Sequence, residues 1–264
     1  MVNTSTPSRV VAFLVFALRI LFPVIVLAED PPVLSPQAIP APAPAPPVPP
    51  LFSGTAEFAF VATTGNSSTE AVGLSSDLAY RPHPWLLNAK GSFVQNRANN
   101  VVSAKSWTAL VRLSRDYSPR LSGFTQYDYL RNLFAGIEQR HTTLGGISYK
   151  VIDASSQYLR LDGALGYANE QRLVGSALST GTVVGGAAYK LKISPTSEIS
   201  DEVRLVDSFT HVRDWRLDQT TALSAKINSI MSLKASYVVR YVHAPTPGFQ
   251  STDTISSITL AAKF

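Results

Sequence analysis

The chain has 264 residues, of which 45% are hydrophobic and 16% are charged, and it contains no cysteine. This length allows one large domain, and the absence of cysteine excludes a disulfide framework and a thiolate metal site. The formal net charge is +5. No basic stripe interleaved with stacking aromatic residues is present, so we expect no nucleic-acid partner.

The first 28 residues have the organisation of a secretion signal. Arg9 precedes an apolar run over residues 10–27, and the small residue Ala28 ends it. We therefore expect a cleaved signal peptide over residues 1–28. The alternative is a retained membrane anchor, but Arg19 interrupts the run, and an arginine at the centre of a spanning helix costs about 2.5–3.5 kcal/mol.

Residues 29–51 follow as a linker rich in proline and alanine, with an Ala-Pro repeat over residues 41–47. This composition favours polyproline II, which at about 3.1 Å per residue reaches roughly 60 Å. We interpret the linker as a periplasmic tether; the alternative is a tail that reaches towards the cell wall or a partner. No later segment offers eighteen uncharged apolar residues, so a membrane-spanning structure would have to be a barrel.

Residues 52–264 read as strands separated by turn residues. In the clearest strand, Leu161 and Leu165 lie on one face, whereas Arg160 and Asp162 lie on the other. This alternation has the period of two that is typical of strands with a different medium on each side. We predict twelve strands, at about Phe52–Ala62, Ala71–Arg81, Trp85–Asn96, Ser103–Arg115, Leu121–Leu130, Thr142–Val151, Tyr158–Ala168, Gly181–Ile193, Glu198–Val206, Trp215–Ile227, Ser232–His243 and Asp253–Phe264.

Alternation alone does not identify the two media. In a soluble barrel or sandwich the apolar face points inward, whereas in an outer-membrane barrel it meets lipid and the charged face lines the lumen. Aromatic residues near strand ends favour lipid, because Tyr and Trp gather at membrane interfaces. These residues are Tyr80, Trp85, Tyr117, Tyr129, Tyr149, Tyr158, Tyr167, Trp215 and Tyr241.

The connections give an independent argument. Short ones such as Pro82–Pro84 alternate with longer ones such as 131–141 and 244–252, as in barrels with short periplasmic turns and longer outer loops. The predicted fold class is therefore all-β: a transmembrane up-and-down antiparallel β-barrel of about twelve strands over residues 52–264. An even strand count places both termini in the periplasm.

The last strand also alternates, with Ile258, Leu260, Ala262 and Phe264 on one face. A closing strand that ends on Phe is typical of bacterial outer-membrane barrels. We therefore predict that Phe264 is an assembly signal and that the barrel-assembly machinery is a partner during biogenesis.

Several short stretches match a known family. They are Gly54-Thr55-Ala56-Glu57-Phe58, the turn over residues 63–69, Arg140 with Gly145-Gly146-Ile147-Ser148-Tyr149, the stretch 161–170, and Lys263-Phe264. On these residues the region 52–264 resembles the salt-induced outer-membrane protein family, a YdiY-like domain of unknown function. The resemblance implies an outer-membrane barrel and carries over no catalytic or ligand-binding residue.

If the chain forms such a barrel, charged residues of both signs line its lumen. The candidates are Arg112, Arg160, Asp162, Glu202, Arg204, Arg216, Asp218, Lys226, Lys234 and Arg240. A twelve-stranded barrel has a narrow interior. Ion pairs would fill it as a plug, which we favour, or leave a slim polar channel. No ring of a single sign commits the lumen to anions or cations.

Three histidines, His141, His211 and His243, fall at the outer ends of predicted strands. A lipid-acting enzyme would use such a histidine to activate a serine and a carboxylate to orient it; the candidates are Ser208 or Ser251 with Asp207, Asp214 or Asp253. The histidines belong to different strands, so we interpret them as unrelated interface residues. We expect no enzyme, no metal and no cofactor.

The sequence thus predicts a monomeric outer-membrane barrel in contact with outer-membrane lipid, with a structural or envelope-stress role or a narrow passive pore. Two alternatives stay open. One is an outer-membrane lipid-acting enzyme that uses the rim histidines and serines. The other is a secreted soluble barrel that binds a small apolar ligand.

Overall fold

The computed structural model of the protein describes residues 50–63, 69–98, 101–209 and 214–264. The predicted signal peptide, the linker up to residue 49 and His211 lie outside the described residues. Among the described residues, no helix combines the length and the apolar composition needed to cross a membrane.

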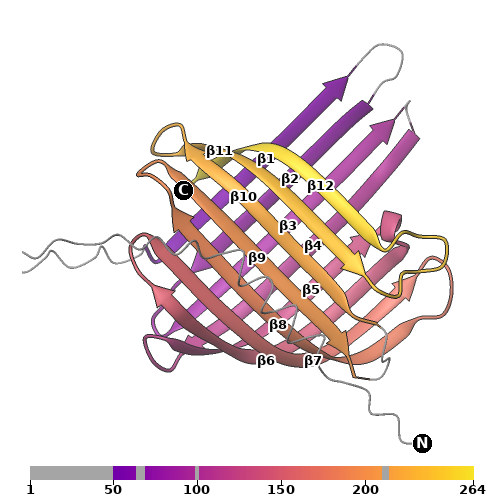
Figure 1. The fold of residues 1–264 in the computed structure, drawn as a ribbon, viewed down its shortest axis with the longest axis horizontal. Coiled ribbons are helices and arrows are strands. Elements are labelled where there is room, and N and C mark those ends of the chain that lie inside the picture. Colours follow the sequence, from indigo (N-terminus) through magenta and orange to yellow (C-terminus); the bar gives the residue numbers. More distant parts are fainter. Residues whose placement is uncertain (1–49, 64–68, 99–100, 210–213) are drawn as a thin grey trace, which may run out of the picture. The chain divides into compact units, whose positions relative to one another are not determined.

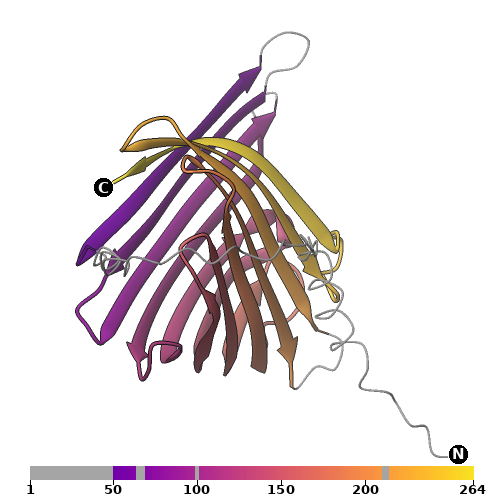
Figure 2. The ribbon, with the colours of Figure 1, turned by 60° about the vertical axis from the view of Figure 1, so that its left-hand side comes forward.

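Twelve antiparallel strands form a closed barrel in which each strand pairs with its neighbours in sequence and β12 returns to β1 (Figures 1 and 2). This confirms the predicted fold class and strand number. The elements are β1 Phe52–Thr63, β2 Thr69–Tyr80, β3 Trp85–Ala98, β4 Val101–Asp116, β5 Leu121–Asn132, the 3-10 helix η1 Leu133–Ala135, β6 Ile137–Asp153, β7 Gln157–Arg172, β8 Leu178–Lys192, β9 Ser197–Ser208, β10 Arg216–Lys226, β11 Met231–Val242 and β12 Thr252–Lys263.

One end of the barrel carries the short turns and both ends of the barrel sequence. Tight turns form there because side chains satisfy the backbone: the Asn228 Oδ1 accepts the N–H of Met231 at 2.7 Å, and the Ser118 hydroxyl accepts that of Leu121 at 3.0 Å. Both are local side-chain caps of the kind that favours Asn and Ser in turns. We call this the short-turn end and the opposite end the outer end.

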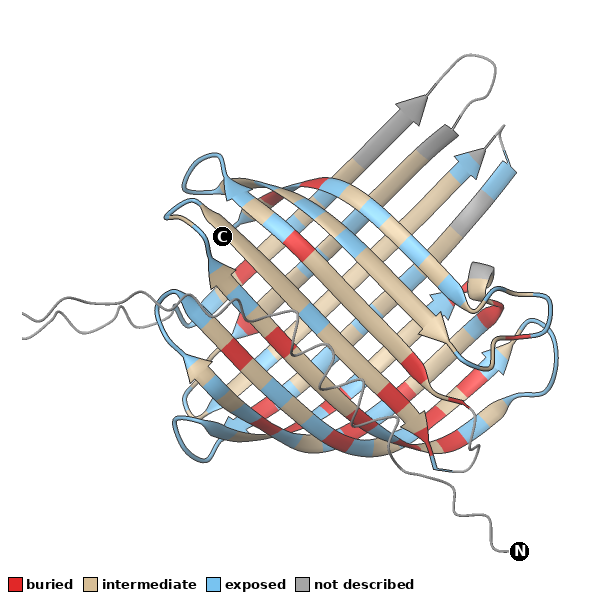
Figure 3. Cartoon of the chain, in the orientation of Figure 1, coloured by how far each residue is buried: buried red, intermediate tan, exposed pale blue. Residues whose placement is uncertain are grey.

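The two faces of each strand differ in composition and exposure. Residues that are paired across neighbouring strands point to the same face of the sheet. The register therefore shows which residues of all twelve strands share the inward face and which share the outward face. Large apolar side chains on the outward face are exposed, with Leu165 at 60% and Ile258 at 69%. Exposed and buried positions alternate along the strands (Figure 3).

The inner wall of strands β5 to β9 also contains a small apolar cluster: Phe124, Leu144, Ala164, Val184 and Val206. Its packing requires glycine, because a Cβ on Gly146 would lie 2.3 Å from the carbonyl oxygen of Gly163.

Candidate functional site in the barrel interior

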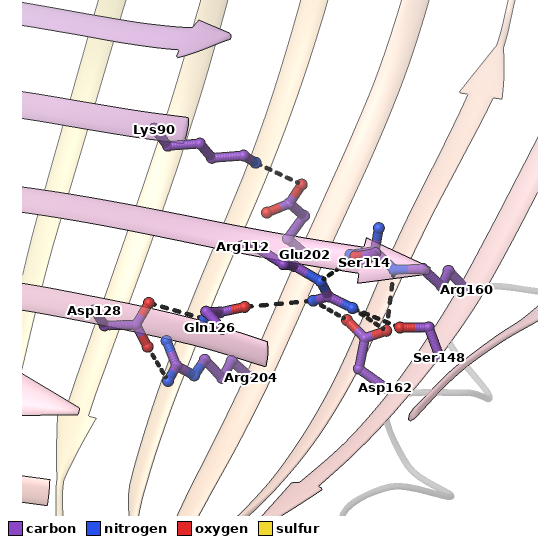
Figure 4. A network of polar contacts seen from close by, with 10 residues as sticks. All are labelled: Lys90, Arg112, Ser114, Gln126, Asp128, Ser148, Arg160, Asp162, Glu202 and Arg204. Atoms are coloured by element: carbon purple, nitrogen blue, oxygen red, sulfur yellow. Dashed lines mark hydrogen bonds and ion pairs between the residues drawn. The ribbon is translucent and has the colours of Figure 1, made fainter. Parts of the chain in front are cut away.

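Ion pairs between strands that are not neighbours identify the charged face as the interior. Lys90 on β3 pairs with Glu202 on β9 across 3.8 Å, and these two strands are diametrically opposite in the closed order. Further pairs join β9 to β5 and β4 to β7 (Figure 4). Side chains on such strands meet only through the lumen, so the lumen is narrow enough for one Lys–Glu pair to span it.

The tightest part of this network is centred on Arg112. Its Nη1 and Nη2 donate to the two carboxylate oxygens of Asp162 at 3.1 and 3.3 Å. Its Nη2 also donates to the Ser148 hydroxyl, and its guanidinium lies 3.5 Å from the ring centroid of Phe124. Arg160 Nε pairs with the same carboxylate at 3.1 Å. A bidentate pair supported by neighbours holds its geometry better than a single contact does, so this cluster fixes β4 against β7.

Arg204 makes a third cross-lumen contact, with Asp128 at 2.6 Å. The register then places Asp218, Arg240 and Asp253 in one row with Arg204, on the same face. Charges of alternating sign therefore follow one another across four strands of the inner wall.

The remaining predicted lumen residues lie on the same face. Lys234 on β11 reaches past β12 to Glu57 on β1 at 2.8 Å. Arg216 lies at the outer end of β10, and Lys226 is exposed at its short-turn end. The structure thus brings most of the ten predicted residues into ion pairs and leaves Lys226 at a mouth of the barrel.

The outer end contains a second ion cluster that the sequence did not predict as a site. The Glu170 carboxylate, only 3% exposed, pairs with Arg172 at 2.6 Å, Arg216 at 2.8 Å and Arg140 at 3.8 Å. Asp214 adds a contact to Arg216 at 3.4 Å. Three guanidinium groups thus surround two carboxylates away from solvent.

The connection between β11 and β12 covers this cluster. A Cβ on Gly136, which has φ +70°, would lie 2.7 Å from the ring of Phe249 and 2.9 Å from Thr246. Gly136 belongs to the β5–β6 connection, so the contact spans opposite sides of the barrel mouth, where Figure 1 shows the two connections together. Thr246 is buried. A loop therefore crosses the outer mouth and rests on the opposite wall.

Water reaches the interior around Lys90 and Glu202 more than it reaches the ion cluster around Glu170 at the outer end. The side chains of Lys90 and Glu202 are 41% and 53% exposed, in contrast to that of Glu170. Because Lys90 and Glu202 point into the lumen, the lumen at their level is hydrated, whereas the ion cluster around Glu170 is packed.

The residues that sequence reasoning missed have identifiable signals. Asp128 and Glu170 follow the same period of two as the predicted residues, but were not assigned to the lumen. Arg140 and Arg172 fell in predicted loops, because β6 and β7 extend beyond their predicted ends. Tyr158 was predicted as an interface aromatic, but the register puts it on the inward face with Arg160.

The two described rim histidines lie on the outward surface, among aromatic rings. The Tyr127 hydroxyl and the His141 Nδ1 are 2.6 Å apart. The ring of His243 stacks on Trp215 at 5.4 Å between centroids. These contacts belong to β6 and to the end of β11, which are not neighbours. Among the described residues, no group of three or more His, Asp or Glu side chains is placed to hold a metal ion.

Phe264, the predicted assembly signal, lies at the seam between β12 and β1. Its backbone N–H and C=O bond to Gly54 at 3.0 and 2.8 Å. A Cβ on Gly54 would lie 2.5 Å from the Phe264 ring, so the ring in its present position packs against the bare backbone of Gly54. The side chain is 61% exposed on the outward face.

A sequence model of the family described as "Protein of unknown function, DUF481" matches residues 56–264. This confirms the family resemblance drawn from the sequence. No curated protein matches the chain.

Several solved structures have a similar barrel. A NanC porin has a TM-score of 0.47 at 9% identity and covers 80% of this chain and 97% of its own. The translocator domain of the autotransporter NalP from Neisseria meningitidis has 0.42 at 13%, covering 81% and 87%. A KdgM porin in complex with disordered oligogalacturonate has 0.40 at 9%, covering 80% and 98%. At these TM-scores and identities the likeness assigns neither a solute nor a role.

Proposed function

Since the chain belongs to the family described as protein of unknown function DUF481, which brings no activity with it, we propose its function from the barrel itself. The protein is an outer-membrane β-barrel whose hydrated lumen is a narrow passive pore for small hydrophilic solutes. Ion pairs across the lumen restrict its width. The exported chain contacts outer-membrane lipid, and its short turns face the periplasm.

The distribution of charge and apolar surface supports the membrane location. Ion pairs cross the interior, while large side chains such as Ile147, Leu165 and Ile258 are exposed outside. A water-soluble protein seldom exposes such a continuous apolar surface. A soluble barrel that binds an apolar ligand would have the opposite arrangement. A closed barrel also pairs its backbone polar groups within the protein, as hydrocarbon requires.

The Lys90–Glu202 pair carries the proposal of a narrow pore. It joins opposite walls, and both side chains are partly exposed to water. An ion pair at this exposure is worth only about 0–1 kcal/mol. The pair therefore narrows a hydrated passage more than it stabilises the fold.

Four measurements test this function. In cells the protein should fractionate with the outer membrane, and the purified protein should migrate differently on a gel before and after boiling. In planar bilayers, Glu202→Gln should raise the single-channel conductance, because it frees Lys90 from the opposite wall, and should change the free energy of unfolding by less than about 1 kcal/mol.

Glu198→Gln is the matched control, because Glu198 shares the strand and face of Glu202 but lies at the short-turn end. It should leave the conductance much closer to that of the unmodified protein. A protein without conductance in the bilayer would contradict the pore, and a protein that stays dissolved without detergent would contradict the membrane location.

A further inference from the structure

The seam that closes the barrel is short. Strands β1 and β12 form four residue pairs, from Thr55–Lys263 to Phe58–Leu260, next to the backbone bonds between Gly54 and Phe264. In contrast, β12 forms eleven pairs with β11. Within the described residues, β12 from Thr252 to Thr259 therefore pairs with β11 alone, and β1 over residues 59–63 pairs with β2 alone. Figures 1 and 2 show the two strands diverging towards the outer end.

Unpaired strand edges do not persist against hydrocarbon. Each backbone N–H or C=O without a partner costs several kcal/mol there. The free edges of β1 and β12 lie in the outer half of the barrel, because the paired part is at the short-turn end. These edges consequently require water, lipid headgroups or another strand.

The composition of β12 changes within the part that is not paired with β1. Beyond Ile258, the outward residues Thr252, Thr254 and Ser256 are all polar, and the inward face carries Asp253 and Ser257 on either side of Ile255. The paired part of the strand keeps an apolar outward face. A strand with hydroxyl groups on both sides fits a hydrated environment on both sides rather than lipid on one.

A row of polar side chains continues from this edge across the outward surface. The register aligns Ser256 with Tyr237, Thr221 and Asp201. The Asp201 Oδ1 accepts hydrogen bonds from Thr221 Oγ1 at 2.6 Å and Gln219 Nε2 at 3.1 Å. A carboxylate on this surface is unfavourable in contact with acyl chains. We therefore expect the polar groups of water or of lipid headgroups to contact the barrel wall along this row.

The axial route to the outside is narrowed by the loop that rests on Gly136 and by the buried Glu170 cluster. On the inward face of its unpaired part, β12 carries Asp253, whose register partner on β11 is Arg240. The free edge of β12 therefore adjoins the row of charged residues on the inner wall.

We propose that the unpaired part of the β1–β12 seam is a lateral opening that admits the polar headgroup of an amphipathic lipid from the outer leaflet. The acyl chains stay in the membrane, along the outward wall. The headgroup lies among the hydroxyl groups of Thr254, Ser256 and Ser257 and reaches the charged lumen. This inference rests on the membrane location given under the proposed function.

A lipid explains more of these features than a docked strand does. A strand added to the edge of β12 would pair with that edge alone, whereas the polar row extends over three further strands to Asp201. Both hydrogen bonds to Asp201 are accepted by Oδ1. Its Oδ2 is thus placed to accept from an ammonium or hydroxyl group of a lipid lying along the wall.

Fluorescence quenching by spin-labelled lipids tests the opening, and the cysteine-free chain allows single labels. We would place a fluorophore on Ser257→Cys at the seam, on Ser200→Cys facing the lumen away from it, and on Ile258→Cys facing lipid. Each protein is reconstituted in phosphatidylethanolamine and phosphatidylglycerol vesicles that contain a lipid with a nitroxide on its headgroup or on its acyl chain. We expect the headgroup nitroxide to quench Ser257 well above Ser200, and the acyl-chain nitroxide to quench Ile258 most.

The outcomes separate the two proposals. Quenching of Ile258 but equal, weak quenching of Ser257 and Ser200 would overturn the lateral opening and leave the membrane location intact. No quenching at Ile258 would overturn the membrane location itself. A second polypeptide crosslinked to position 257 in cells, with the label shielded from both nitroxides, would assign the edge to strand pairing and also overturn the opening.

A disulfide pair provides an independent geometric test. If the seam register continued, Val61 would face Ser257, as Thr55 already faces Lys263. We expect Thr55→Cys/Lys263→Cys to oxidise readily and Val61→Cys/Ser257→Cys to oxidise far more slowly, because cysteines bridge only when their Cα atoms lie within about 7 Å. Equal oxidation of the two pairs in vesicles would show a closed seam and refute the opening.

Discussion

Replacement of Glu170 by glutamine should strongly destabilise the barrel. The carboxylate is almost fully buried and contacts three guanidinium groups, those of Arg140, Arg172 and Arg216. Glutamine keeps the shape but removes the charge, which leaves three buried cations with the single carboxylate of Asp214. Removal of one partner from a buried ion pair costs about 3–5 kcal/mol, because the other charge stays buried without compensation.

Urea unfolding in detergent micelles, followed by the gel shift between folded and unfolded protein, measures this effect. With a slope of about 1–3 kcal/mol/M, Glu170→Gln should lower the urea midpoint by roughly 1–5 M. Glu198→Gln is the control, because this partly exposed residue at the short-turn end should change the stability by no more than about 0.5 kcal/mol.

A second substitution distinguishes charge from packing. Adding Arg140→Gln to Glu170→Gln removes one of the three guanidinium groups and should recover part of the lost stability, since residues in one ion network are not additive. A midpoint for Glu170→Gln equal to that of the unmodified protein would refute the reasoning. Strictly additive losses in the double variant would show that the charges are not coupled.

Two further predictions concern packing and assembly. Gly146→Ala should destabilise the barrel by about 1–3 kcal/mol, because the added Cβ would clash with the neighbouring backbone. Gly163→Ala has open space around the added Cβ and should be neutral or stabilising by about 0.5–1 kcal/mol. Urea midpoints compare the two variants, and equal losses of stability would contradict the packing argument. Phe264→Ser should lower the amount of assembled protein in the outer membrane more than it lowers the stability of refolded protein, because the backbone bonds to Gly54 do not require the ring; unchanged assembly in cells would remove Phe264 as the signal.

Much of the fold could be predicted because apolar and polar residues alternate along each strand, according to the medium that each face contacts. Strand number, turn positions and the common face of Arg160 and Asp162 all followed from that period. The ends of the strands were less accurate where polar residues continue the alternation beyond the membrane. For this reason Arg140 and Arg172 were predicted to lie in loops, and the ion cluster around Glu170 was not predicted.

Which charges meet inside the barrel could not be read from the sequence. Lys90 and Glu202 are 112 positions apart, and nothing local to either residue indicates the other. Their contact depends on the number of strands, which puts β3 opposite β9, and on a register that brings both side chains to one level. A change of two strands in the predicted count would have paired different walls.

The seam differs in this respect, because its signal is local. From Thr252 to Ser256, the outward face of β12 carries only hydroxyl groups, which interrupts the alternation of apolar and polar faces seen in the rest of the strand. A membrane strand has no reason to give up its apolar face unless that face does not meet acyl chains. The interruption lies within the part of β12 that does not pair with β1, and a loop crosses the outer mouth beside it. Polar composition and missing pairing thus have one cause, which is contact with water or headgroups at the side of the barrel rather than at its end.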